Sequence, residues 1–188
     1  MSGTLAYACA AASVLLAGGA AAQAHPDFSG RWTTGPPAAA PSARDAAAAP
    51  TNPVARAADL GSGWGRSITI VQDARTLTVQ WAIFTSYDMQ PPLTFVYALD
   101  GSERVNAVMM GRGVQRQRSR AAWHGDSLVI TTVHTLTDPA TGRDVPTEVR
   151  QTLALASATS LVIETVRGGA LGGPPSTTRT VYTKGGGT

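Results

Sequence analysis

The stretch from residue 113 to 135, GVQRQRSRAAWHGDSLVITTVHT, is rich in side chains that could do chemistry. Arg116, Arg118 and Arg120 stand at every second position and could bind phosphates. His134, near the far end, could transfer a proton or hold a polar ligand. Side chains alternate across a β-strand, so the three arginines would share one face and the residues between them the other.

A two-residue turn at Gly125-Asp126 would fold this stretch into a hairpin. The arginines then stand opposite threonine and valine, a solvated pattern, and the chain contains no basic run. We therefore predict no nucleic-acid site. The other face ends in apolar residues and is predicted to point inward, with the pairs Trp123–Leu128, Ala121–Ile130, Ser119–Thr132 and Gln117–His134.

The next hairpin, around residues 156–160, repeats the pattern. Its inner face runs outward from the turn through leucine and isoleucine, and then reaches Gln151 on one strand and Arg167 on the other. In the hairpin that joins residues 68–70 to 77–79, the inner face runs out to Trp81. Each inner face thus carries apolar side chains near its turn and larger or more polar side chains far from it.

Period-two alternation between turn residues continues along most of the chain, and it predicts an all-β protein. Sequential hairpins close into an antiparallel up-and-down barrel, here of eight to ten strands, because closure removes exposed sheet edges. Residues 34–65, rich in Ala and Pro, would form a loop or short-helix lid after the first strand. The ten strands are expected at residues 28–33, 66–72, 76–82, 92–99, 103–109, 115–124, 127–136, 147–155, 160–167 and 177–184.

The two ends of such a barrel differ, because connections alternate between them. One end receives four short turns, and the other receives every long Gly- or Pro-rich loop. The polar inner residues point toward the long-loop end, and functional residues concentrate on loops over a rigid scaffold. The predicted ligand site at this end consists of Gln117, His134, Gln151, Arg167, Trp81, Trp64, Tyr87 and Met109. The alternative is that these polar residues line a solvated barrel opening and that side chains fill the lumen of the barrel.

Residues 1–24 have the apolar centre and the Ala22-Gln23-Ala24 ending of a secretory signal peptide, which predicts cleavage before His25. The alternative is an uncleaved anchor. We expect residues 25–188 to form a single domain, monomeric and periplasmic or secreted, without a stable membrane anchor. The single cysteine, Cys9, lies in the signal, so the mature chain excludes disulfide scaffolds and thiol catalysis.

Residues 27–32, DFSGRW, resemble the Gly-x-Trp opening of lipocalin-like (calycin) barrels. The resemblance implies that Trp32 closes one barrel end and that an arginine of the last strand, here Arg179, packs over it. Ten strands with a helical insert also resemble the layout of fatty-acid-binding proteins. The segments GSGWG, YDMQPPL, MMGRG and GGPPSTTR, at residues 61–65, 87–93, 109–113 and 172–179, resemble a family of small exported bacterial barrel proteins of unknown function. That resemblance implies a fold and a compartment and no activity.

The sequence has no nucleophile elbow, phosphate loop or dinucleotide fingerprint. His134 has no second histidine near it, so no metal, cofactor or catalytic group is assigned. The function favoured is binding of a small, largely apolar or amphipathic molecule with a polar or anionic head. The alternatives are a small-molecule enzyme that uses His134 as acid and base, and a structural envelope module without a ligand.

Overall fold

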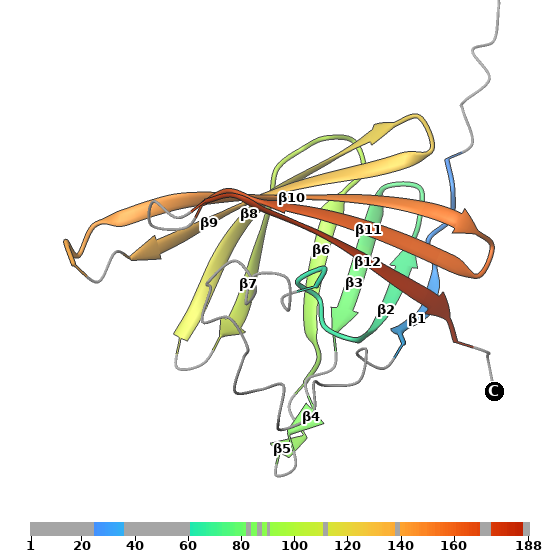
Figure 1. The fold of residues 1–188 in the computed structure, drawn as a ribbon, viewed down its shortest axis with the longest axis horizontal. Coiled ribbons are helices and arrows are strands. Elements are labelled where there is room, and N and C mark those ends of the chain that lie inside the picture. The colour runs from blue at the N-terminus through green and yellow to red at the C-terminus, as the bar shows by residue number, and fades with distance from the viewer. Residues whose placement is uncertain are drawn as a thin grey trace, which may run out of the picture.

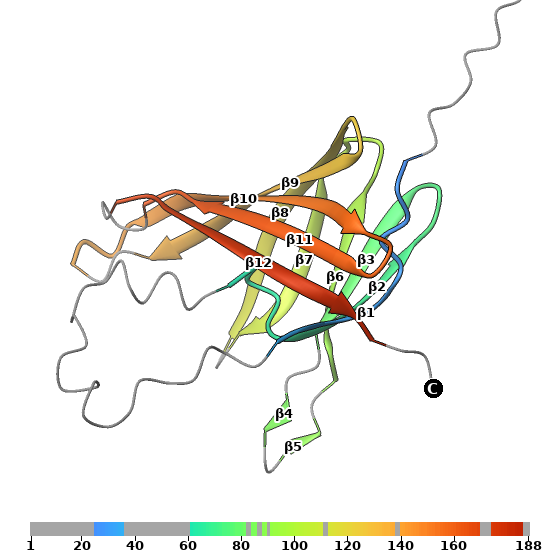
Figure 2. The same cartoon turned by 45° about the vertical axis from the view of Figure 1, so that its right-hand side comes forward.

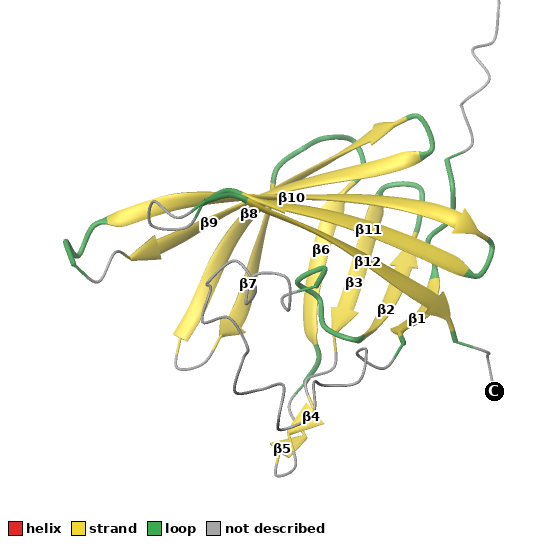
Figure 3. Ribbon diagram, viewed as in Figure 1, coloured by secondary structure: helices red, strands yellow, loops and turns green. Residues whose placement is uncertain are grey.

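A computed structural model describes residues 25–35, 61–81, 84–85, 88–89, 91–110, 113–137, 140–169 and 174–185. Ten strands form one antiparallel sheet that curls into a nearly closed up-and-down barrel (Figures 1 and 2). No helix occurs in these residues (Figure 3). The all-β barrel predicted from the alternation of the sequence is therefore confirmed.

All ten predicted strands are present, with ends that differ by up to three residues. A further hairpin, β4 (Phe84–Thr85) with β5 (Asp88–Met89), forms a separate small sheet that projects from the barrel (Figure 1). The barrel strands are β1 (Gly30–Thr34), β2 (Ser67–Gln72), β3 (Thr76–Trp81), β6 (Leu93–Ala98), β7 (Arg104–Met110), β8 (Gly113–His124), β9 (Ser127–Thr137), β10 (Asp144–Ser157), β11 (Ser160–Arg167) and β12 (Ser176–Lys184).

Barrel strands that follow one another in the chain pair with each other, except β6 and β7, and β1 pairs with β12, so the sheet lacks one ladder for full closure. The break lies between β6 and β7, which no backbone ladder joins in the described strands. Asn106 on β7 bridges them instead. Its Oδ1 accepts from the Val96 amide at 2.8 Å, and its Nδ2 donates to the Val96 carbonyl at 3.1 Å.

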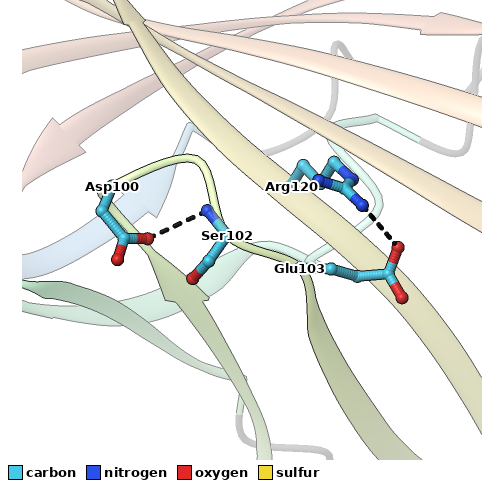
Figure 4. Close-up of polar contacts among 4 residues, drawn as sticks. All are labelled: Asp100, Ser102, Glu103 and Arg120. Atoms are coloured by element: carbon cyan, nitrogen blue, oxygen red, sulfur yellow. Dashed lines mark hydrogen bonds and ion pairs between the residues drawn. The ribbon is translucent and has the colours of Figure 1, made fainter.

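The β8–β9 hairpin has the register that its turn predicts, with Ala121 opposite Ile130 and Arg118 opposite Val133. Arg116, Arg118 and Arg120 are exposed on the outer face. Arg120 forms an ion pair of 3.2 Å with Glu103, beside the β6–β7 turn that Asp100 caps through the Ser102 amide (Figure 4). The three arginines thus behave as a solvated strand face.

Apolar side chains fill the half of the barrel that lies next to the short turns. They come from all around the sheet and are fully or almost fully buried, because inward positions alternate with solvated ones along each strand. The set with an exposed fraction of 0–1% comprises Phe28, Trp32, Ile68, Ile70, Leu77, Val79, Ala121, Leu128, Ile130, Leu153, Leu161, Ile163 and Tyr182. Side chains with almost no accessible surface leave little space for water between them, so this half of the barrel is tightly packed.

Trp32 is fully buried, as the Gly-x-Trp resemblance implies, but its cationic neighbour is not Arg179. Lys184, directly opposite Trp32 in the β1–β12 ladder, places its Nζ 5.2 Å from the centre of the Trp32 ring. Arg179 is exposed and stands opposite Glu164 on β11. The expectation for Arg179 is therefore wrong, because the register of β1 on β12 brings a residue five positions later over the tryptophan.

Candidate functional site

On β8 to β12, the inner face changes from apolar to polar toward the long-loop end. Polar residues on five adjacent strands, β8 to β12, are buried there, next to the half-buried His134 and Arg167. Buried polar groups cost free energy unless they are hydrogen-bonded, so the partner of each one matters. The set on these strands comprises Gln117, Ser119, Thr132, Thr147, Gln151, Thr165 and Thr178, with exposed fractions of 0–8%.

Residues 61–65, here called the plug loop, supply partners for several of these side chains. The Ser62 carbonyl accepts from Gln151 Nε2 at 2.6 Å and from Thr165 Oγ1 at 3.5 Å. The Gly61 carbonyl accepts from Arg167 Nη2 at 2.6 Å and from Thr178 Oγ1 at 2.8 Å. Two predicted site residues, Gln151 and Arg167, therefore hold a segment of their own chain inside the barrel.

The alternating glycines of GSGWG make this course of the backbone possible. Gly61, Gly63 and Gly65 have φ angles of 51°, 88° and 77°, a region that side chains rarely tolerate. Gly65 also lies against the indole of Trp81, and a Cβ at this position would overlap that ring. The motif is thus explained by backbone geometry and close approach.

Aromatic residues fix the other side of the plug loop. The Tyr182 hydroxyl lies 2.6 Å from Ser62 Oγ and donates to the Gly65 carbonyl at 2.6 Å. Trp64 is buried and packs against Tyr97, with ring centres 6.0 Å apart. Burial raises the pKa of Tyr97 well above its usual range, so this phenol stays neutral.

His134 and Thr147 lie directly opposite each other in the β9–β10 ladder. Burial, and then the positive charge of Arg167, lowers the pKa of the His134 imidazole. Within the described part of the chain, the His134 ring makes no hydrogen bond, and the Thr147 hydroxyl is buried without a partner. Together they form the part of the polar cluster that the plug loop leaves unsatisfied.

Gln117 is buried near the same end and donates to Gln115 Oε1 at 3.2 Å. The β8–β9 ladder runs as far as Arg118 and Val133, one position short of the predicted pair Gln117–His134. Of the other predicted site residues, Trp64 belongs to the plug loop, and Trp81 contacts it at Gly65. Tyr87 and the side chain of Met109 lie outside the described residues.

The predicted site contains the polar strand positions Gln117, His134, Gln151 and Arg167 but not Ser62, Thr147 or Thr178. Thr165 is expected from the sequence on the inner face beside Arg167 but is not assigned to the site. The inward-facing threonines at the long-loop ends of β10 and β12 could have been read from the same alternation. Residues 36–60, which contain most of the predicted lid and its helix, lie outside the described residues. The plug loop, residues 61–65, is the described C-terminal end of the predicted lid.

The described residues contain no cluster of three or more His, Cys, Asp or Glu side chains suited to a metal ion. They also contain no helix of the length and hydropathy that a membrane-spanning helix needs. Neither the known protein families nor the curated proteins contain a match to this sequence. The all-antiparallel barrel is consistent with a lipocalin-like architecture, and this architecture is compatible with ligand binding.

Proposed function

We propose that the protein is an exported binding protein for a small molecule with a polar head, held at the long-loop end of the barrel. The head would meet the His134 imidazole and the Thr147 hydroxyl, with Gln117 nearby. Charge supports this placement, because Arg167 makes the surroundings of His134 positive and so favours a polar or anionic group.

The observation that carries the proposal is the Thr147 hydroxyl. It belongs to a side chain with an exposed fraction of 7%, and it has no partner among the described groups. A buried hydroxyl without a hydrogen bond costs about 1–3 kcal/mol, which a bound carbonyl, hydroxyl or carboxylate would recover. The neighbouring imidazole, kept neutral near pH 7 by its lowered pKa, offers both a donor and an acceptor to the same ligand group.

The packing of the barrel limits the size and position of the ligand. The apolar half next to the turns is tightly packed, so a long acyl chain has no room along the barrel axis. The apolar part of the ligand must therefore lie near the mouth, against the loops or in the place of Trp64. A compact amphipathic molecule therefore fits this barrel better than a fatty acid.

Native mass spectrometry of protein purified from its own host tests the proposal. We expect a co-purified molecule of defined mass, retained by the wild type and lost or strongly reduced in Thr147→Val. Thr177→Val is the matched control, because Thr177 is exposed on the outer face of β12. A ligand-free wild type, or equal retention in the two variants, would contradict the proposal.

A structural envelope module is the second candidate, and the plug loop favours it. Four inward side chains, Gln151, Thr165, Arg167 and Thr178, bind plug-loop carbonyls, as ligand-binding groups would bind a ligand. A barrel that binds its own segment in this way is stabilised without a second molecule. In that case protein from its host is ligand-free, and Thr147→Val is as stable as the wild type or more so.

A further inference from the structure

A groove crosses the turn end of the barrel, at the opposite end from the plug loop. It consists of two adjoining clefts of about 290 and 580 Å³. The N-terminal segment, the β2–β3 turn, the β6–β7 turn and the end of β8 form its walls. Both clefts are lined by His25, Ala74, Leu99 and Trp123.

The indole of Trp123 is a platform on which a flat ring already lies. The His25 imidazole stacks on it with ring centres 4.2 Å apart and planes 3° from parallel. Phe28 is also nearly parallel to the indole, with ring centres at 5.8 Å and planes at 9°. The exposed His25 imidazole is a planar nitrogen heterocycle. Its stacking indicates that a ligand ring of the same kind could stack on the Trp123 indole.

Contacts with Gln72 hold the segment that carries His25. Gln72 Nε2 donates to the Pro26 carbonyl at 2.9 Å, and its Oε1 accepts from the Phe28 amide at 3.0 Å. The fold therefore positions the segment up to Pro26, whereas His25 itself is exposed, and its stacking on Trp123 is its one ring or hydrogen-bond contact among the described residues. A competing ring needs to displace only one side chain.

The two clefts carry different charges. The smaller is lined by Asp27 and Asp73, whose hydrogen bonds to neighbouring turn residues lower their carboxyl pKa values, so both are anionic at neutral pH. The larger is lined by Arg75 and Arg104 together with Asp100. Acceptors for N–H groups thus line one cleft, and cations that bind an anion line the other.

We propose that this groove binds a small molecule with a planar nitrogen heterocycle and an anionic group, such as a mononucleotide. The heterocycle stacks on Trp123 in the place of His25, with its N–H groups toward Asp27 and Asp73. The anionic group lies toward Arg75 and Arg104. The volume of the larger cleft falls in the range of small-molecule sites.

Isothermal titration calorimetry with adenosine 5′-monophosphate and with adenosine tests this proposal. Because charge-assisted hydrogen bonds discriminate strongly, we expect the monophosphate to bind about tenfold more tightly than the nucleoside. His25→Gly removes the competing ring and is expected to tighten the binding of both probes. Trp123→Leu is expected to abolish it.

The double variant Arg75→Gln/Arg104→Gln keeps the platform and is expected to lose only the preference for the monophosphate. Arg116→Gln/Arg118→Gln, on the outer face of β8, is the matched control and should keep it. If neither probe binds His25→Gly at concentrations up to about 1 mM, the proposal is wrong. The proposal is also wrong if Arg75→Gln/Arg104→Gln still binds the monophosphate more tightly than the nucleoside. This comparison can be made even if Trp123→Leu does not fold.

The result is independent of the function proposed for the long-loop end. Binding that His134→Gln removes and Trp123→Leu retains would place the heterocycle at the mouth, and it would overturn the assignment to the groove. Loss of the co-purified ligand in Thr147→Val, with monophosphate binding unchanged, would support two separate sites.

Discussion

Gln151 Nε2 donates a 2.6 Å hydrogen bond to the carbonyl of Ser62, a residue 89 positions earlier in the chain. Both residues are almost completely buried, so this bond ties the plug loop to the centre of β10. A residue that the sequence presents as a ligand contact is thereby also a contact within the fold.

Gln151→Leu should therefore destabilise the protein. The substitution removes the shorter of the two hydrogen bonds that the Ser62 carbonyl accepts from side chains and leaves the 3.5 Å bond from Thr165. Loss of one such hydrogen bond costs about 0.5–1.5 kcal/mol. Urea unfolding monitored by circular dichroism measures the difference. Gln80→Leu, at a half-buried position on β3, is the control, and an equal loss in the two variants would contradict the role of the Ser62 contact.

Arg167→Leu and His134→Leu should have different effects on stability. Arg167 donates to Gly61 and Thr178, so its loss is expected to cost about 1.5–3 kcal/mol, the range for charged hydrogen bonds. His134 makes no hydrogen bond in the described part of the chain, and its replacement should change stability by less than about 0.5 kcal/mol at pH 7.5. Denaturant midpoints compare the two variants, and equal losses would show that His134 is also structural.

Stability should fall when the pH drops below about 6.5. The pKa of His134 is lowered in the folded state from an ordinary value of 6.5, so the unfolded chain takes up a proton more readily than the folded one. The contribution of the neutral His134 to the free energy of unfolding is complete above pH 6.5. It is lost as the pH falls toward the lower pKa of the folded state. Unfolding free energies of wild type and His134→Gln at pH 7.5 and 5.5 measure it, and the variant should show the smaller decrease. His124→Gln, at an exposed site, is the control.

Gly65→Ala should destabilise the protein far more than Gly125→Ala. Both glycines have positive φ, but a Cβ at Gly65 meets the Trp81 ring, whereas one at Gly125 meets open space. Backbone strain alone costs about 1–2 kcal/mol at either position, and the overlap adds to it only at Gly65. Thermal unfolding compares the two variants. Similar melting temperatures would mean that the plug loop moves away from Trp81 at little cost.

Lys184→Met should weaken the cover over Trp32 by about 0.5–1 kcal/mol, the range for an exposed cation–π contact. Arg179→Met serves as the comparison, because Arg179 lies on the outer face and does not approach the tryptophan. Denaturant unfolding distinguishes the two residues. A greater loss of unfolding free energy in Arg179→Met than in Lys184→Met would indicate that Arg179 packs over Trp32, as the lipocalin-like resemblance implies.

The strands could be predicted because their signals are local. Gly125-Asp126 sets the register of β8 on β9, and alternation then places each side chain of the hairpin on a face. The polar mouth follows from the same alternation, which carries Gln151 and Arg167 to the inner face far from their turn.

The partners of those inner residues could not be predicted in the same way. Gly61 and Ser62 reach Arg167 and Gln151 across 106 and 89 positions, and nothing near either partner in the sequence encodes the meeting. The same limit explains the error at Trp32. Its cation depends on how β1 pairs with β12, a register that no turn between them sets.

Asn106 gives the barrel a preferred line of opening. Elsewhere adjacent strands are joined by backbone ladders, whereas the described parts of β6 and β7 are joined by the two hydrogen bonds of one carboxamide. Parting these strands breaks fewer hydrogen bonds than parting any other pair of neighbouring barrel strands in the described part of the chain, so we expect the sheet to open there first. Hydrogen exchange at the Val96 amide would then report this local opening well before global unfolding.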